Sequence, residues 1–405
     1  MLDGLGQILI YIVPFLLVLT LIVTIHELGH FWVARLFGVK IDRFAIGFGR
    51  ALFSRHDRHG IEWRVGWLPF GGYVKFAGDL DASSVPDCAG LDELKARLAA
   101  EGGAGAERDY FHFKPVWQRA LIVAAGPAAN FVLAILIFTV LFATLGDRIA
   151  PPRVVNVVPG SVAEAAGFRP NDLIVEVNGA PARGGQDVIR AVSLNSDTPV
   201  RFMVEREGVR TPLVVTPVRT ETEDEIAGRI RVGRIGLEMG YRRDEMRFIR
   251  YTPIEALGAG VGQTGEVLST TLSYLGRIVT GRESGDLLNG PLGIAKAAGG
   301  VTRQAVDTPA PAELRAANLA LTLIQFAAIL SIGIGFLNLL PVPVLDGGHL
   351  LFYAYEAVAR RPLPAGVQEA GYRVGLALLA GLMLFATWND LQKLNLFKFL
   401  GGLVS

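Results

Sequence analysis

Long uncharged hydrophobic runs alternate with polar stretches along this chain and indicate its architecture. Four runs have the length and composition that allow a helix to cross the roughly 30 Å hydrocarbon core of a bilayer, the last only marginally. We therefore predict a polytopic α-helical membrane protein with about four transmembrane helices. The runs are Leu5–Phe37, Ala120–Leu145, Leu319–Leu345 and Val374–Trp388, of which the last is short unless it begins nearer Ala370.

The segment 39–78 between the first two runs has a different character. It is apolar and rich in glycine, in a pattern typical of strands. Such β structure can enter the membrane only where protein buries it or where it lines a wet cavity. We expect a membrane-associated β-rich loop region over residues 38–118, cytoplasmic or re-entrant.

An extracytoplasmic α/β domain is predicted over residues 151–219. A strand at 154–158 leads to a short helix at Ala163–Ala166 and a second strand at 172–177, and a hairpin then turns at Glu207-Gly208. This order, and the string PGSVAEAAGFRPNDLIVEVNG, resembles a bacterial PDZ domain. PDZ domains bind peptides by strand addition and hold a terminal carboxylate in backbone amides. A sandwich-like domain without peptide binding is the alternative.

Beyond this domain we expect a linker and an amphipathic helix at the membrane surface over 253–281, where Glu255 and Glu266 argue against a span. The predicted division of the chain is a first transmembrane helix (1–37), the β-rich loop region (38–118), a second transmembrane helix (119–146), the PDZ-like domain (151–219), the linker with the interfacial helix (220–317), a third transmembrane segment (318–358), a fourth transmembrane helix (370–390) and a C-terminal tail (391–405).

Composition agrees with a mixture of spans and soluble parts. The 405 residues are 51% hydrophobic, with a mean hydropathy of +0.39. This is too apolar for an ordinary soluble protein and too polar for a chain that lies wholly in the membrane. A net charge of +1 gives no electrostatic basis for binding nucleic acid. Cys88 is the only cysteine, so an internal disulfide is excluded.

Basic residues near the ends of the runs predict the orientation. By the positive-inside rule, loops 38–118 and 359–373 face the cytoplasm, while both termini and the segment 146–318 lie outside. An inverted topology is the alternative. The first 34 residues contain no Lys or Arg, and the basic residues used here are Arg35, Lys40, Arg43, Lys114, Arg119, Arg360, Arg361 and Arg373.

Within the first run, the stretch Gln7–Ile25 carries no charge and is followed directly by the ionisable pentapeptide His26-Glu27-Leu28-Gly29-His30. One charged group at mid-bilayer costs roughly 2.5–3.5 kcal/mol, whereas a structural zinc site returns about 10–16 kcal/mol. On a helix, His26 and His30 project from one face and reach one zinc ion, and Glu27 stands beside them as a general base. Two histidines on a helix face without any metal are the alternative.

A catalytic zinc needs a third protein ligand, which must come from elsewhere in the chain because Leu36 stands where a metzincin has its third histidine. Asp346 is the only carboxylate between Glu313 and Glu356, and it follows the third run in a segment rich in proline and glycine. It is the preferred third ligand, partly on the family resemblance given below, with His349 as the rival.

These motifs together resemble the site-2 protease family, which are intramembrane zinc metalloproteases, here of the bacterial regulator-of-sigma-E type. HELGH at 26–30 and NLLPVPVLDGG at 338–348 carry the resemblance, with GGYVK at 71–75, GPAANF at 126–131 and NGPLGIAK at 289–296. The resemblance implies Zn²⁺ bound by His26, His30 and Asp346, with Glu27 as the base.

The expected substrate-binding residues fall into two groups. The resemblance implies that Asn338 and Asn130 hold substrate near the metal, although a structural asparagine in a broken helix is the alternative for Asn338. The strand-like segment 61–76, with Gly71, Gly72 and Tyr73, is expected to accept an unwound substrate as an added strand.

The sequence thus predicts hydrolysis of peptide bonds inside transmembrane segments. The expected partners are single-span proteins such as anti-sigma factors or signal-peptide remnants, a peptide or carboxyl terminus at the PDZ-like domain, and the lipid bilayer, but no nucleic acid. The expected location is the bacterial inner (cytoplasmic) membrane. A non-catalytic PDZ scaffold with a structural zinc is the alternative, and Glu27 separates the two because a structural site needs no general base. A zinc transporter would need more intramembrane ligands than these runs supply.

Overall fold

The computed structural model describes residues 2–78, 98, 106–224, 228–242, 244–283, 285 and 288–393. The chain divides into two compact units, one of Met1–Ile137 with Ile294–Phe385 and one of Phe138–Gly293 with Ala386–Ser405. Most of the predicted C-terminal tail, from residue 394, lies outside the described residues.

Four helices are long and apolar enough to cross a membrane, which fits a polytopic membrane protein. The third helix ends at Asn338, earlier than the predicted run, because Pro341 and Pro343 follow and cannot continue it. The fourth helix is longer than predicted and begins at Ala365. The four helices are α1 (Leu2–Leu36), α3 (Val116–Leu145), α8 (Ala312–Asn338) and α10 (Ala365–Lys393).

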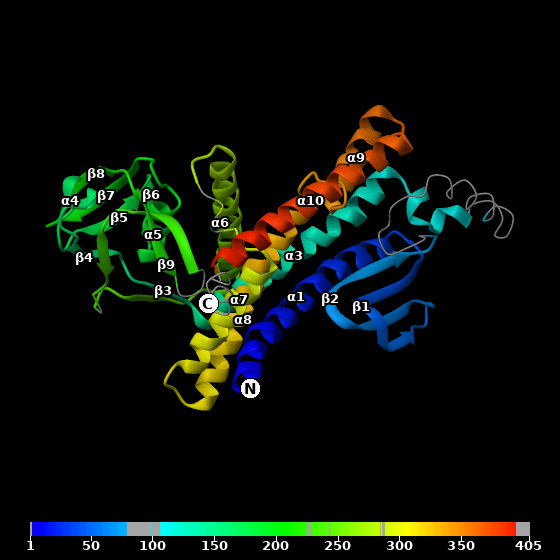
Figure 1. Cartoon of the computed structure of the whole chain (residues 1–405), viewed down its shortest axis with the longest axis horizontal. Coiled ribbons are helices and arrows are strands. Elements are labelled where there is room, and N and C mark those ends of the chain that lie inside the picture. The colour runs from blue at the N-terminus through cyan, green and yellow to red at the C-terminus, as the bar shows by residue number, and fades with distance from the viewer. Residues whose placement is uncertain are drawn as a thin grey trace, which may run out of the picture. The chain divides into compact units, whose positions relative to one another are not determined.

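Helix α1 is the centre of the first unit (Figure 1). Its Val18 and Ile22 pack against Ala327 of α8 in a small buried cluster. Helix α7 (Pro291–Asp307) also meets α1, because Gly299 leaves room for the ring of Tyr11: a Cβ there would lie 1.8 Å from Tyr11 Cδ1. The short helix α9 (Asp346–Ala359) follows the turn after α8.

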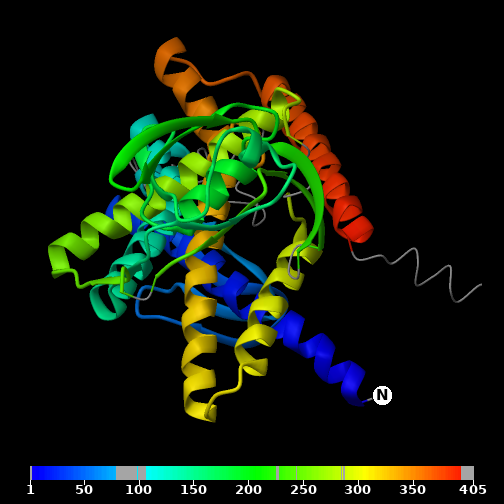
Figure 2. The ribbon, with the colours of Figure 1, turned by 90° about the vertical axis from the view of Figure 1, so that its left-hand side faces the viewer.

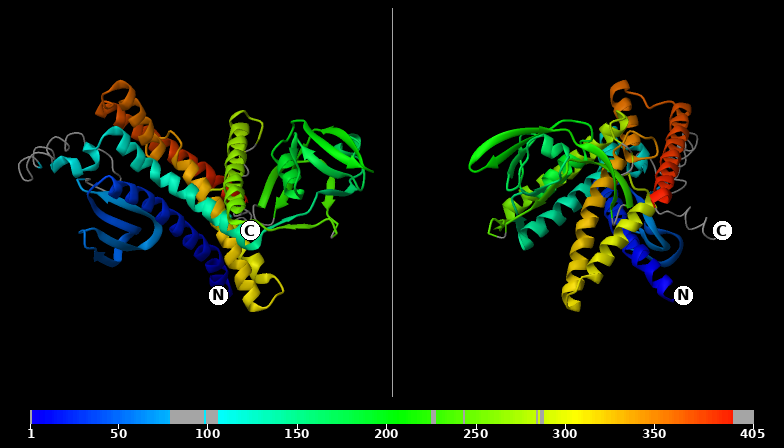
Figure 3. Two further views of the ribbon diagram at one scale, coloured as in Figure 1. Left: turned by 180° about the vertical axis from the view of Figure 1, so that it is seen from behind. Right: turned by 60° about the vertical axis from the view of Figure 1, so that its left-hand side comes forward.

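The predicted β-rich segment forms one long antiparallel hairpin beside α1, drawn in blue in Figure 3. It consists of β1 (Ile41–His56) and β2 (Glu62–Phe76). Phe44, Val74 and Phe76 are buried against Phe31 of α1. Across the hairpin, Arg43 Nε donates to Glu62 Oε2 at 2.5 Å. The Ser54 hydroxyl and then Arg43 lower the pKa of Glu62. Two 3₁₀ turns, η1 (Ala106–Asp109) and η2 (Phe111–Phe113), precede α3.

An antiparallel sheet and a layer of helix form the core of the second unit (Figure 2). The sheet order is β11-β4-β5-β7-β8, with β6 paired to β5. Ile174, Val188 and Phe202 are among the residues buried between the strands and α5. The elements are β4 (Arg153–Val157), α4 (Val162–Ala165), β5 (Leu173–Val177), β6 (Ala180–Pro181), α5 (Gly185–Ser193), β7 (Val200–Arg206), β8 (Val209–Val215) and β11 (Leu237–Gly240).

The sheet extends beyond residue 219, the predicted end of the domain. Strand β11 lies at one edge, antiparallel to β4, so part of the expected linker belongs to the sheet. The other strands of this region pair outside the main sheet: β9 (Val218–Asp224) with β10 (Gly228–Arg234), and β12 (Arg247–Ile249) with β3 (Asp147–Ile149).

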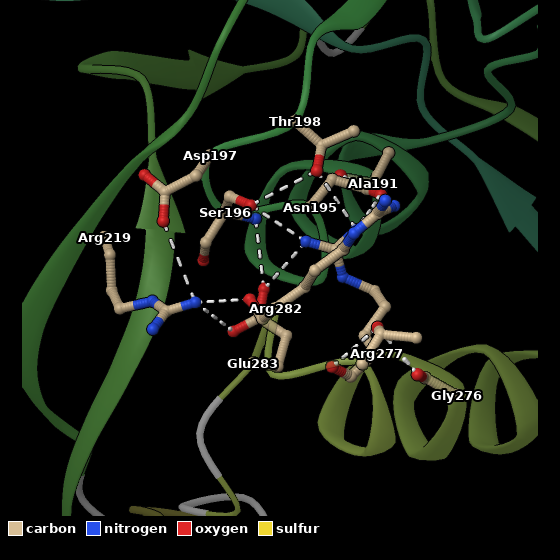
Figure 4. A network of polar contacts seen from close by, with 11 residues as sticks. Ala191, Asn195, Ser196, Asp197, Thr198, Arg219, Gly276, Arg277, Arg282 and Glu283 are labelled. Carbon is tan, nitrogen blue, oxygen red and sulfur yellow. Dashed lines mark hydrogen bonds and ion pairs between the residues drawn. The ribbon is translucent and has the colours of Figure 1, made fainter.

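Helix α6 (Pro253–Val279) follows β12 and is not among the four candidate spans found in the described residues. A capping box at Thr252 and Glu255 begins it. Its last turn is joined to the loop after α5 by a polar network (Figure 4). Arg277 Nη2 donates to the Ser196 carbonyl at 2.8 Å and to Glu283 Oε1 at 3.2 Å. The network fixes the end of α6 to the sheet domain.

Candidate metal centre

Two histidines of α1 face each other within one turn of the helix. His26 and His30 are four residues apart, which places them on the same face. Their Nε2 atoms lie 3.2 Å apart, and their rings meet edge to face with centroids 4.8 Å apart. Two ring nitrogens that converge in this way are typical of a shared metal ligand set.

Asp346 reaches the same point from α9, although it is far from the histidines in sequence. Its Oδ2 lies 3.1 Å from His26 Nε2 and 3.5 Å from His30 Nε2. The turn before it is tight, because a Cβ at Gly347 would lie 2.3 Å from the Leu339 carbonyl oxygen. Glycine is therefore needed beside Asp346 for the chain to approach the end of α8 so closely.

Backbone strain marks the same turn. Val344 has φ of 116°, a value that a β-branched residue rarely adopts. Such strain persists only where the surrounding structure imposes it, and it concentrates at functional sites. The carboxylate of Asp346 is thus held at the histidines by a turn whose conformation is costly.

The donor set fits a zinc ion. Within the described residues, one ligand atom from each of His26, His30 and Asp346 lies within 4.8 Å of the others. Asp346 Oδ2 is buried and has no hydrogen-bond partner in the described part of the chain apart from its contacts with the two imidazole nitrogens. Two imidazole nitrogens and one carboxylate oxygen leave a fourth position open, as in catalytic zinc sites.

Glu27 stands next to this ligand set and is held by the β hairpin. Its Oε2 accepts a hydrogen bond from the backbone N–H of Val74 in β2, at 3.1 Å. The same strand approaches at Gly72, where a Cβ would lie 3.4 Å from Glu27 Cγ and 2.7 Å from the Ala45 carbonyl oxygen. A carboxylate oriented beside a candidate metal is the arrangement that a general base requires.

Comparison with known proteins agrees with this geometry. The model of Peptidase family M50 matches residues 14–382. The chain belongs to Peptidase family M50. It is 46% identical to Metalloprotease MmpA of Caulobacter vibrioides over 395 residues, 98% of each chain. It is also similar to a protein of Agrobacterium fabrum that is named as a putative zinc metalloprotease, with 44% identity over 384 residues, covering 95% of this chain and 96% of the relative.

Membership of this M50 family makes the protein a metalloendopeptidase of the site-2 protease type, with Zn²⁺ as its metal. It is a multi-pass membrane protein by its four candidate spans and its relatives. The predictions of family, enzyme class and cofactor are confirmed. The roles of the individual residues, by contrast, remain predictions.

The structure brings one of the two predicted asparagines to the metal ligands. Asn130 of α3 is fully buried, and its amide nitrogen lies 3.2 Å from His26 Nδ1. Asn338 is the last residue of α8 and is half-buried at the start of the turn that leads to Asp346. The rival ligand His349 is outside the converging group found in the described residues, and its Nδ1 lies 3.5 Å from the Tyr372 hydroxyl.

The predicted substrate-binding residues of β2 lie between two contacts with α1. Thr20 Oγ1 donates to the Pro69 carbonyl at 2.9 Å, and Val74 N–H donates to Glu27. Gly71 has φ of 96°, and the Phe48 ring lies where its Cβ would stand. The Tyr73 hydroxyl accepts from Arg43 Nη1 at 3.3 Å. This edge of β2 therefore follows α1 towards the metal centre.

Sequence reasoning missed three groups that contact the site. They are the N–H of Val74, the carbonyl of Ile122, which lies 2.9 Å from His30 Nδ1, and the small residue Gly126. Backbone groups leave no signal in side-chain identity. The spacing of Gly126 and Asn130 was a usable signal, because residues four apart share one helix face.

Proposed function

We propose that this protein hydrolyses peptide bonds within the transmembrane segments of single-span membrane proteins, in regulated intramembrane proteolysis. Anti-sigma factors and signal-peptide remnants are the substrate classes that we favour. The observation that carries the proposal is the convergence of His26, His30 and Asp346 beside Glu27 on a helix that is itself a candidate span. Ionisable residues in such a segment are expensive and therefore functional.

Each residue of the centre has a proposed role. His26, His30 and Asp346 hold the zinc ion, which when bound supplies a Lewis acid to polarise the scissile carbonyl. Glu27 accepts a proton from the attacking water and returns it to the leaving amine. The N–H of Val74 holds the Glu27 carboxylate in place for both transfers. Asn338 holds the substrate backbone beside the centre.

A helical substrate must unwind before cleavage, since its peptide groups are occupied by internal hydrogen bonds. We propose that the edge of β2 at Gly71, Gly72 and Tyr73 accepts the unwound segment as an added strand. Its support is the course of this edge along α1, between the contacts of Pro69 and Val74. Proline at Tyr73 is expected to abolish cleavage with zinc content intact, and normal cleavage would refute strand addition.

The deciding experiment replaces the general base. Glu27→Gln is expected to keep bound zinc and to lose cleavage of a single-span substrate by at least the 10²-fold typical of general-base catalysis. Glu313→Gln is the matched control, because Glu313 is exposed in the first turn of α8. Full cleavage by Glu27→Gln would instead support the alternative of a membrane scaffold with a structural zinc.

We place the protein in the bacterial inner membrane, with loops 38–118 and 359–373 in the cytoplasm and the sheet domain of the second unit outside. The support is the excess of Lys and Arg beside the candidate spans. In a Cys88→Ala background, Arg58→Cys and Val209→Cys put single thiols at exposed positions of the hairpin and of the sheet domain. In spheroplasts, whose cytoplasmic membrane is intact, a thiol reagent that does not cross the membrane is expected to label only Val209→Cys. Labelling of Arg58→Cys alone would mean an inverted topology.

We further propose that the sheet domain is PDZ-like and takes a peptide or a carboxyl terminus. The support is a cavity of about 1040 Å³ that lies against helix α5 and β11, an edge strand of the kind that strand addition requires. Residues of α6 line its other side, and Arg190 of α5 is ion-paired with Glu266 of α6.

This domain either receives a carboxyl terminus freed by an earlier cut or excludes substrates with bulky outer domains. Ile189→Asp changes the cavity wall, and Val209→Asp is the control at an exposed hairpin. A receptor predicts that Ile189→Asp alone loses cleavage of pre-cut substrates. A steric filter predicts full activity for both variants, whereas deletion of 151–219 releases cleavage of intact substrates.

A further inference from the structure

Helix α3 presents one face to the two histidines of the metal centre. Ile122, Gly126 and Asn130 are spaced by four residues and therefore lie along the same face. The Ile122 carbonyl lies 2.9 Å from His30 Nδ1, and the Asn130 amide lies 3.2 Å from His26 Nδ1. One helix face thus contacts the Nδ1 atoms of both histidines, while their Nε2 atoms converge on Asp346.

Gly126 allows this close approach. A Cβ at this position would lie 2.2 Å from His30 Nε2 and 2.9 Å from His26 Cε1. Any larger residue would displace the imidazoles or the helix. The residue between the two contacting groups is therefore restricted to glycine by the rings themselves.

The two Nδ1 partners differ in chemistry. The Ile122 carbonyl only accepts, so His30 carries its proton on Nδ1 and keeps the lone pair of Nε2 for a metal. The Asn130 amide can either donate through Nδ2 or accept through Oδ1. When Nδ2 donates to His26 Nδ1, that nitrogen must be unprotonated, so the imidazole proton is on Nε2. His26 Nε2 lies 3.1 Å from Asp346 Oδ2.

The opposite orientation of the amide is the one that serves a metal. A half-turn of the Asn130 amide brings Oδ1 to His26 Nδ1, which then donates its proton and frees Nε2. It pairs the buried Oδ1, which has no partner among the described residues, and moves Nδ2 to the position that Oδ1 occupies here, so the gain lies in the free Nε2 of His26 and not in the number of hydrogen bonds. Asn130 is otherwise well fixed, since it is 0% exposed and its backbone carbonyl accepts from Ser331 Oγ at 2.9 Å.

We propose that Asn130 is a positioning residue for the zinc ligand His26, through acceptance of the Nδ1–H by its side-chain oxygen, and does not contact substrate. The proposal rests on the assignment of His26 as a ligand in the proposed function. Outer partners of this kind fix the tautomer and the orientation of a ligating histidine. Together with Ile122, Asn130 makes α3 the support for both nitrogen ligands.

The test measures zinc affinity of the purified full-length protein by competition with a chelator. Asn130→Leu keeps the volume and removes the acceptor, and it is expected to weaken zinc binding by about 10–100-fold. Asn130→Asp keeps an acceptor oxygen at the same place and is expected to restore most of the affinity. Ser331→Ala removes only the contact to the Asn130 backbone and is expected to bind zinc as the wild type does.

The outcomes separate this proposal from its rivals. Unchanged zinc affinity in Asn130→Leu with a raised KM would overturn it in favour of a substrate contact. Equal loss of zinc in Asn130→Leu, Asn130→Asp and Ser331→Ala would overturn it in favour of a packing role. If Asn130→Leu does not fold, the comparison of Asn130→Asp with Asn130→Ser decides, since only Asp keeps an oxygen at the full length. Zinc binding is measured without substrate, so absence of proteolysis in the wild type would refute the proposed function alone.

Discussion

Glu27 of α1 and Val74 of β2 are joined by a hydrogen bond of 3.1 Å, from the backbone N–H to the carboxylate Oε2. The bond links the candidate general base to the hairpin that is proposed to receive substrate. It also couples the base to a strand that is held to α1 a second time, in its middle, by the hydrogen bond from Thr20 Oγ1 to the Pro69 carbonyl. A shift of β2 would therefore move Glu27 without touching the metal ligands.

Gly72→Ala tests this link. The added Cβ would lie 2.7 Å from the Ala45 carbonyl oxygen, so β2 must shift against β1, and Val74, which holds Glu27, shifts with it. A misplacement of about 1 Å can cost 10²-fold in rate. We expect kcat to fall by about 10–100-fold while zinc content, measured by atomic absorption, stays at the wild-type level.

Gly333→Ala provides the control for this substitution, because a Cβ there meets nothing within 4 Å. It adds the same methyl group to α8 and is expected to leave kcat unchanged. Loss of zinc in Gly72→Ala would contradict the prediction, since the strand would then support the ligands and not the base.

The third ligand is tested by comparing Asp346→Ala with His349→Ala. Asp346 Oδ2 lies with both histidines, whereas His349 is outside the converging group of the described residues. Loss of a ligand is expected to weaken zinc binding by more than the roughly 100-fold that an outer partner costs. Chelator competition is expected to show this loss in Asp346→Ala alone. A similar loss in His349→Ala would mean that His349 is itself a zinc ligand.

The sequence predicted the parts of the fold that depend on hydrophobic runs and on the prolines and glycines that end helices and form turns. The hydrophobic runs predicted the spans. The HELGH spacing, the prolines before Asp346 and the glycines after it, together with the family resemblance, predicted the group His26, His30 and Asp346. Strand β11 was not predicted, because it is only four residues long and becomes a strand through its pairing with β4. The contact of Val74 with Glu27 could not be predicted either, because almost every residue has a backbone N–H and the sequence does not mark the one that will bind Glu27.

The sheet domain is expected to lose stability in acid through Glu245. Hydrogen bonding by Arg153 lowers the pKa of Glu245 from its ordinary value of 4.5. The unfolded chain therefore takes up this proton first, so the stabilisation is complete above about pH 4.5 and is lost as the pH falls through the lower folded value. The melting temperatures of wild type and Glu245→Gln, measured from pH 7 down to pH 3, are expected to converge in acid. Glu313→Gln is the control, and its difference from the wild type is expected to stay constant over this range. A constant difference would exclude the linkage.

The network at the end of α6 is expected to be the strongest polar contact of the second unit (Figure 4). The Glu283 side chain is 3% exposed, and it accepts from Arg277 and from the Ser196 N–H. Removing one partner of a buried pair costs about 3–5 kcal/mol when the other charge is left without compensation. Here Arg219 Nη2 lies 3.6 Å from Glu283 Oε2 and keeps part of that compensation.

Because Arg219 stays beside Glu283, Arg277→Ala is expected to lower the free energy of unfolding by up to about 3 kcal/mol, the lower end of this range. Arg303→Ala, which breaks an exposed pair with Asp307, is the control and is expected to cost under about 1 kcal/mol. Denaturant unfolding of both variants, together with hydrogen exchange of α6, measures the difference. Equal costs would mean that the network does not hold α6 to the sheet domain. Protection lost from α6 in Arg277→Ala alone would show that this ion pair is what couples the helix to the domain that precedes it.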